Sequence, residues 1–156
     1  MKTRLPFRYS RPVSFSSWAV LAVMSLGAGC GPDFSGHWQG NLNESWTCSD
    51  GSSAPSISNP INWVISEGGG LIKIVTTGAC GTFDAEQRGS EAELLPKDCP
   101  QVVNPGNGAI LVQHVRTGQL SLRGETMSVT LNSAIDVYTS SARGVCQSVA
   151  TGVLGH

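Results

Sequence analysis

The sequence predicts an all-β protein whose strands form an antiparallel up-and-down barrel of about eight strands. Composition is the first reason, because the chain of 156 residues is 40% hydrophobic and holds 19 glycines and 8 prolines, which suits short strands joined by many turns. The second reason is that apolar and polar residues alternate through several stretches. The third is that no stretch beyond residue 30 repeats its apolar residues with a sustained helical period. The length predicts a single folded domain.

The strands are expected to follow one another along the second part of the chain. In 34–48, apolar Trp38 and Leu42 share one face, and asparagine, serine and threonine occupy the other. The segments 109–115 and 118–124 are expected to form one bent strand. The remaining expected strands are 61–66, 68–77 with its initial glycine turn, 80–87, 125–138 and 144–154.

Three segments between these strands are less regular. Segment 90–95 fits either a short helix or a strand, because Ser90 and Glu93 can form a capping box shortly before a proline. Segments 49–60 and 97–108 are rich in serine, glycine, proline or asparagine, which favours loops. We expect 49–60 to be a mobile loop and 97–108 to be a second long loop.

Four of the five cysteines are expected to form two disulfides. If the first and last strands pair antiparallel, Cys48 can face Cys146, and a bridge there would hold the two ends of the domain together. Cys80 and Cys99 would form the second bridge, although four cysteines allow three pairings and the sequence does not choose among them. The same register places large residues opposite small ones in the pairs Gly40–Leu154, Leu42–Gly152 and Trp46–Ser148.

The first 29 residues have the layout of a cleaved secretory signal peptide. An apolar stretch over 18–28 is too short to cross a bilayer as a helix of roughly 20 residues, and small residues then lead to Cys30. No pair of adjacent arginines is present, which favours general secretion across the inner membrane over the twin-arginine route. The basic residues that precede the apolar stretch are Lys2, Arg4, Arg8 and Arg11.

The stretch LGAGC at 26–30 resembles the lipobox of bacterial lipoproteins. The resemblance implies that Cys30 is lipidated, with palmitate among its acyl chains, and becomes the first residue of the mature chain. Lipidation of Cys30 also leaves an even number of cysteines for disulfides. Residues 30–33 would then be a short lipidated tether, and Gly31 in place of an aspartate implies anchoring in the outer membrane. The alternative is an ordinary signal peptide cut near Ala28.

The stretch FSGHWQG at 34–40 is similar to the Gly-x-Trp motif on the first strand of lipocalin-like and calycin-like barrels. The motif corresponds to Gly36, His37 and Trp38 in this chain. The resemblance implies that the barrel domain covers 34–156 and that Trp38 closes one end of it. It does not identify a ligand, because one fold serves many functions.

Charge and motifs exclude several classes of function. Four of the ten basic residues precede residue 12, whereas all eleven acidic residues follow residue 32, so the folded part is acidic and unsuited to nucleic acid. No catalytic serine motif is present, and no cofactor is expected. We expect no metal site, because His37, His114 and His156 lack metal-ligand spacing and there is no Cys-x-x-Cys.

A cluster of four acidic residues has two interpretations. It can form a cation site or a carboxylate pair of the glycosidase kind, or it can lie on a charged, solvent-facing hairpin that keeps a sheet edge soluble. The sequence favours the hairpin. The residues are Asp84, Glu86, Glu91 and Glu93.

Trp38, Trp46 and Trp63 are the candidate ligand-binding residues. They can line a cavity and stack on an apolar or sugar ligand, or they can fill the core of a small barrel, which the sequence favours. The sequence predicts a non-enzymatic lipoprotein that is anchored to the membrane by its lipid and binds a small apolar ligand. The alternative is an envelope protein-interaction or inhibitor module with a filled core.

Overall fold

The computed structural model describes residues 32–156. The predicted signal peptide, 1–29, and the predicted lipidation site, Cys30, lie outside the described residues. Strands account for 72% of the described residues, and there is no helix among them. Accordingly, this part of the chain contains no helix that is long and apolar enough to cross a bilayer.

Ten strands follow one another through the described residues, and two of them are only two residues long. They are β1 (Gly36–Cys48), β2 (Ser53–Gly68), β3 (Leu71–Thr76), β4 (Thr82–Arg88), β5 (Glu91–Leu94), β6 (Lys97–Asp98), β7 (Val102–Val103), β8 (Ile110–Arg123), β9 (Thr126–Tyr138) and β10 (Arg143–Gly155).

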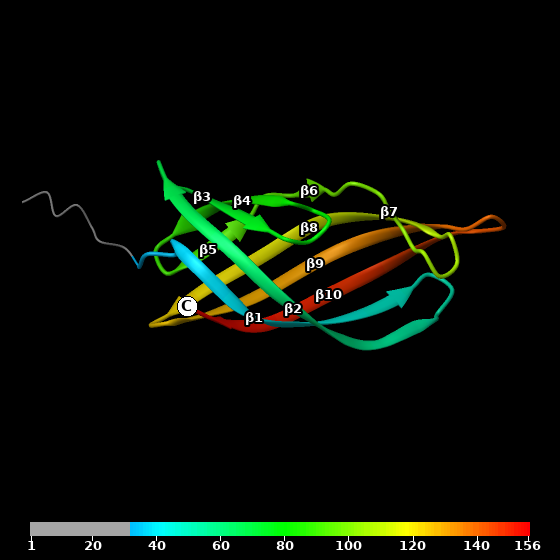
Figure 1. Ribbon diagram of the computed structural model, residues 1–156, viewed down its shortest axis with the longest axis horizontal. Coiled ribbons are helices and arrows are strands. Elements are labelled where there is room, and N and C mark those ends of the chain that lie inside the picture. Colours follow the sequence, from blue (N-terminus) through cyan, green and yellow to red (C-terminus); the bar gives the residue numbers. More distant parts are fainter. Residues whose placement is uncertain (1–31) are drawn as a thin grey trace, which may run out of the picture.

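Eight of these strands form a closed antiparallel ring, so the predicted fold class is confirmed. Each strand pairs with the next in the order β1-β2-β3-β4-β5-β8-β9-β10, and β10 pairs with β1 to close the ring. The short strands β6 and β7 continue along β8 beyond β5. Figure 1 shows that β1, β2, β8, β9 and β10 are long and extend well past the short strands β3, β4 and β5.

The seam between the first and last strands has the predicted register. Cys48 faces Cys146, and the two residues are joined by a disulfide. Gly40 faces Leu154 and Trp46 faces Ser148, so large side chains meet small ones along the seam. The second disulfide joins Cys80 to Cys99, which is the second bridge that follows from pairing Cys48 with Cys146.

The end of the ring that holds both ends of the described chain is filled with apolar side chains. Phe34, Trp38, Met127 and Leu154 are at most 1% exposed. The indole Nε1 of Trp38 donates a hydrogen bond of 2.7 Å to the carbonyl oxygen of Phe34. The rings of His156 and Trp38 pack in a T-shaped arrangement, with 5.0 Å between the ring centroids. We call this end of the ring, which Phe34, Trp38, Met127 and Leu154 fill, the closed end.

The prediction of a mobile loop over 49–60 is wrong for most of that segment, because β2 begins at Ser53. Ala54 pairs with Trp46 and Pro60 pairs with Asn41, so β1 and β2 form one long ribbon. β3 pairs with β2 only from Trp63 onward, which leaves the first part of β2 as an edge strand. An edge strand tolerates proline because one side of its backbone has no partner strand.

Three further predictions concern the segments around β8. Segment 90–95 contains the strand β5 rather than a helix, because it pairs with both β4 and β8. The predicted loop 97–108 contains β6 and β7, which pair with β8. The expected single bent strand over 109–124 is confirmed as β8, and the pairing with β9 shifts between Val115 and Thr117, which is where a bulge bends it.

Replacing Gly152 by alanine is expected to weaken the seam and to lower the free energy of unfolding by about 1–3 kcal/mol. A Cβ at Gly152 would lie 2.1 Å from the backbone oxygen of Asn41, so β1 and β10 would have to separate. Gly144→Ala on the same strand is the matched control, since no atom lies within 4 Å of its added Cβ. Urea unfolding measures both variants, and equal losses of stability would contradict this account of the seam.

Candidate functional site

A cavity of about 430 Å³ lies inside the ring, beyond the apolar residues of the closed end. Its size falls within the range of roughly 300–1,000 Å³ that is typical of small-molecule sites. The alternation of each strand turns every second side chain toward this space. The inward-facing apolar residues that line it include Leu42 of β1, Trp63 of β2, Phe83 of β4, Val115 of β8, Leu131 of β9 and Ala150 of β10.

Polar side chains also face the cavity, from β1, β2, β8 and β9. Glu44 lines it and accepts hydrogen bonds from the Ser148 hydroxyl, at 2.5 Å, and from the Asn59 amide, at 3.4 Å. The amide of Gln113 donates to the hydroxyl of Ser133 at 3.1 Å. Both serines are only 2% exposed, so their hydroxyls depend on these partners.

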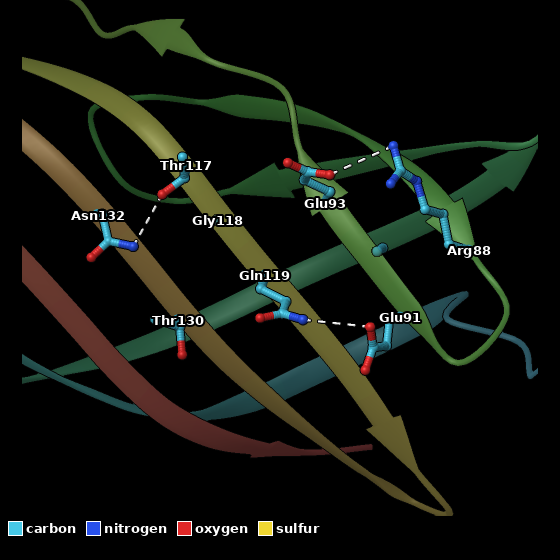
Figure 2. A pocket seen from close by; sticks show the side chains of 9 residues that line it. Arg88, Glu91, Glu93, Thr117, Gly118, Gln119, Thr130 and Asn132 are labelled. Atoms are coloured by element: carbon cyan, nitrogen blue, oxygen red, sulfur yellow. Dashed lines mark hydrogen bonds and ion pairs between the residues drawn. The ribbon is translucent and has the colours of Figure 1, made fainter.

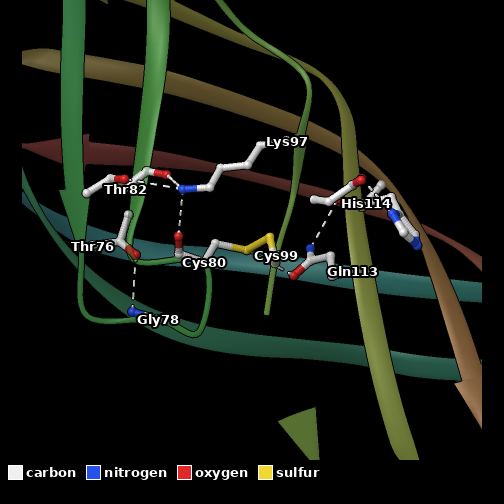
Figure 3. The surroundings of a disulfide bond; sticks show 10 residues. Thr76, Gly78, Cys80, Thr82, Lys97, Cys99, Gln113 and His114 are labelled. Carbon is white, nitrogen blue, oxygen red and sulfur yellow. Dashed lines mark hydrogen bonds and ion pairs between the residues drawn. A yellow bond between two sulfur atoms is a disulfide. The ribbon is translucent and has the colours of Figure 1, made fainter. Parts of the chain in front are cut away.

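The turn between β3 and β4 forms part of the rim of the cavity, and a disulfide holds it in place (Figure 3). Cys80 in this turn is bonded to Cys99, whose backbone N–H donates to the carbonyl oxygen of Gln113 on β8. The ammonium group of Lys97 donates to the carbonyl oxygens of Cys80 and Thr82. The rim is therefore attached to β6 and to the Cys99 segment beside β8 by one covalent bond and several hydrogen bonds.

The three predicted ligand-binding tryptophans occupy three different environments. Trp38 is buried in the closed end and does not line the cavity. Trp63 is 3% exposed and lines the cavity wall. Trp46 lies between Ala54 and Ser148 on the neighbouring strands and does not line the cavity either. Its indole nitrogen is buried and has no hydrogen-bond partner among the described residues.

Sequence reasoning missed the polar wall of the cavity. Glu44 has the same parity as Leu42 and Trp46, so the alternation of the first strand already placed it on the inner face. The signal that could have found it is a charged residue at a position where the pattern calls for an apolar one. Asn59 was missed for another reason, because its segment was interpreted as a loop.

A second pocket, of about 380 Å³, lies on the outer face of β5, β8 and β9 (Figure 2). Its polar side chains pair with one another: the Gln119 amide donates to Glu91 at 3.5 Å, and the Asn132 amide donates to Thr117 at 3.0 Å. Because these groups satisfy each other and the pocket lies on an outer face, it is a weaker candidate than the cavity.

The four clustered acidic residues lie on the outer face of β4 and β5 and are all exposed. Glu86 faces Glu93 across the two strands, and the Arg88 guanidinium lies 3.6 Å from the first carboxylate and 3.7 Å from the second. This cationic group compensates the repulsion between the two carboxylates. The arrangement fits the solvent-facing hairpin rather than a cation site.

A third polar cluster surrounds His114 on the outer side of β8. Its Nδ1 atom lies 2.6 Å from a carboxylate oxygen of Asp98, and its Nε2 atom lies 3.7 Å from Asp136. The hydrogen bond with His114 lowers the pKa of the Asp98 carboxyl below its ordinary value. Burial opposes ionisation of Asp136, but hydrogen bonds from Tyr138 and Arg143 outweigh it, so the pKa of Asp136 is lowered as well.

The contact between Asp98 and His114 is expected to make the attachment of β6 to β8 sensitive to acid. A carboxyl whose pKa is lower in the folded state stabilises the fold at pH values above its unfolded pKa of 3.8. This stabilisation is lost as the pH falls through the pKa of the folded state. Asp98→Asn should therefore reduce stability at about pH 6 and have much less effect at about pH 3. Urea unfolding at both pH values tests this, with Asp84→Asn on the outer face of β4 as the control. A loss of the same size at both pH values would contradict it.

Within residues 32–156, no group of three or more histidine, cysteine, aspartate or glutamate side chains is placed to hold a metal ion. Comparison with protein-family models, with curated proteins and with solved structures finds no match to this chain. The cavity and its lining are thus the features from which a function can be argued.

Proposed function

We propose that this chain is a secreted lipoprotein whose barrel binds a small apolar ligand in the cavity and catalyses no reaction. The observation that carries the proposal is the cavity of about 430 Å³ with Trp63 on its wall. Its lining combines aliphatic and aromatic side chains with a few polar groups, which is the usual composition of a small-molecule site. The four carboxyl groups with lowered pKa values, Asp33, Asp50, Asp98 and Asp136, do not line it, which favours binding over catalysis.

The anchor in this proposal rests on the sequence. The apolar stretch over 18–28 and the lipobox-like LGAGC support lipidation of Cys30 and transport to the outer membrane. More than one acyl chain is needed for stable anchoring, and the lipoprotein modification would supply this. The likeness to lipocalins likewise rests on the Gly-x-Trp motif and on the eight-stranded ring.

The position of the cavity supports access to the ligand from solution. Phe34 is fully buried in the closed end, so the tether of residues 30–33 would join the barrel there. The cavity includes the exposed turn residues Thr77, Gly78 and Ala79, which lie between β3 and β4. A lipid anchor at the closed end would thus leave the mouth of the cavity free of the membrane surface.

Native mass spectrometry of the protein taken from its own cells tests both parts of the proposal. We expect a mass that includes acyl chains on Cys30, two disulfides and a bound small molecule. Cys30→Ala should release the protein from the membrane and remove the acyl mass. A Cys30→Ala protein that stays membrane-bound with the mass otherwise unchanged would show that the lipoprotein assignment is wrong.

Two protein variants test whether the ligand binds in the cavity. Ala150 is 8% exposed and lines the cavity, so Ala150→Leu should fill part of that space and reduce the amount of bound molecule. Val153→Leu lies on the outer face of the same strand, where the side chain is 59% exposed, and should leave binding unchanged. Equal retention of the molecule by both variants would place its binding site elsewhere.

A further inference from the structure

Glu44 breaks the apolar pattern of the inner face. It lies between Leu42 and Trp46 on the inner side of β1, and it faces Ala150 of β10 and Ile57 of β2 across the two neighbouring pairings. A carboxylate that is partly removed from water in this way destabilises the fold unless its oxygens find partners. Departures of this kind from the local pattern are expected at functional sites.

The protein supplies only part of the partners that this carboxylate can take. A carboxylate has about four acceptor positions on its two oxygens. The Ser148 hydroxyl uses one position on Oε1, and the Asn59 amide uses one on Oε2 through a longer contact of 3.4 Å. The remaining positions are available to a molecule in the cavity, which Glu44 lines.

No positive charge balances Glu44 from within the cavity. Among the described residues that line the cavity, Glu44 is the only one with an ionisable side chain, since Cys80 is bonded to Cys99. Lys97 comes near the wall, with its ammonium 5.7 Å from the centre of the Phe83 ring. Its three N–H groups are directed to the carbonyl oxygens of Cys80 and Thr82 and to the Thr82 hydroxyl, so this cation is engaged on the rim.

We propose that the natural ligand is an amphipathic amine, with an apolar body in the cavity and a protonated amino group on Glu44. This inference rests on the proposed function and specifies the chemical class of the ligand. The apolar body would contact Leu42, Trp63 and Leu131, which line the same space. The amino group would supply the cation and the N–H donors that the carboxylate lacks, in a partly dry site where a charge-assisted hydrogen bond is strong.

The test compares three small molecules that share one apolar body and differ only in the head group. They are 4-phenylbutylamine, 4-phenylbutanol and 5-phenylpentanoate. Isothermal titration calorimetry is carried out on the protein purified after expression of the full chain. The alcohol can still donate a hydrogen bond to the Glu44 carboxylate, but it brings no positive charge, and the carboxylate introduces a like charge. We therefore expect the amine to bind about tenfold or more tightly than either.

Glu44→Gln removes the charge with little change in shape and should abolish the preference for the amine. Glu125→Gln is the matched control, because Glu125 lies in the turn between β8 and β9 at the closed end and should leave the preference intact. Circular dichroism establishes that each variant is folded. The comparison of the three molecules on the unchanged protein needs no variant, so the proposal remains testable if Glu44→Gln does not fold.

The outcomes separate this inference from the proposed function. Equal binding of all three molecules by the unchanged protein would overturn the amine proposal and leave the apolar binding site standing. A preference for the amine that persists in the folded Glu44→Gln variant would overturn the role of Glu44. If none of the three molecules binds, the cavity is not a site for small apolar ligands, and both proposals are wrong.

Discussion

Replacing Cys48 and Cys146 together by alanine is expected to lower the free energy of unfolding by about 4.7 kcal/mol. The bond closes a loop with a sequence separation of 98 residues, and in the chain-entropy model the stabilisation grows with the length of that loop. A loss of this size is comparable with the whole stability of many domains, which is roughly 5–15 kcal/mol. The double variant should therefore be partly unfolded under mild conditions.

The second disulfide provides the matched control for this prediction. Cys80 and Cys99 are separated by 19 residues, so their double alanine variant should lose only about 3 kcal/mol. Urea unfolding of both double variants, at the same pH and temperature, gives the two free energies. If the variant that lacks the Cys80–Cys99 bond is the less stable of the two, loop closure does not account for the contribution of these bonds.

Replacing Trp38 by alanine is expected to cost about 3–5 kcal/mol, because it leaves a large hole in the closed end. The side chain is 1% exposed and packs in the same cluster as Phe34 and Leu154, and the His156 ring packs against it in a T-shaped arrangement. The change also leaves the Phe34 carbonyl oxygen without the hydrogen bond from the indole nitrogen. Thermal and urea unfolding measure the loss.

Trp38→Phe separates packing from hydrogen bonding at the same position. It keeps most of the apolar volume and loses the indole N–H, so we expect it to retain more than half of the stability that Trp38→Ala loses. Binding in the cavity should persist in Trp38→Phe, because Trp38 does not line that space. A phenylalanine variant as unstable as the alanine variant would mean that the hydrogen bond, rather than packing, holds the closed end together.

Much of the ring could be predicted because side-chain parity and strand pairing follow simple geometry. Once β1 and β10 are taken as antiparallel neighbours, placing Cys48 opposite Cys146 determines every other pair along the seam, down to Gly40 with Leu154. The core positions in β1 and β9 follow in the same way, since alternate residues of a strand share a face.

Other elements could not be predicted because distant strands decide them. The beginning of β2 has a sequence typical of a loop, and it is a strand because the last residues of β1, from Glu44 to Thr47, offer it a partner. β5 contains only four residues, which fit a helix equally well in isolation, and it is a strand because β4 and β8 flank it on both sides.

The sequence by itself determined the all-β class and the inward and outward faces of β1 and β9, and it offered a disulfide pairing that is compatible with closure of the ring. These properties depend on local alternation and on the register of one strand pair. Only the tertiary structure decided that Trp38 fills a closed end while Trp63 lines a cavity, and that Glu44 meets Asn59 on its wall and accepts a hydrogen bond from the buried Ser148. The physical reason is that a cavity is the space left between side chains of many strands, so its position depends on how they all pack together.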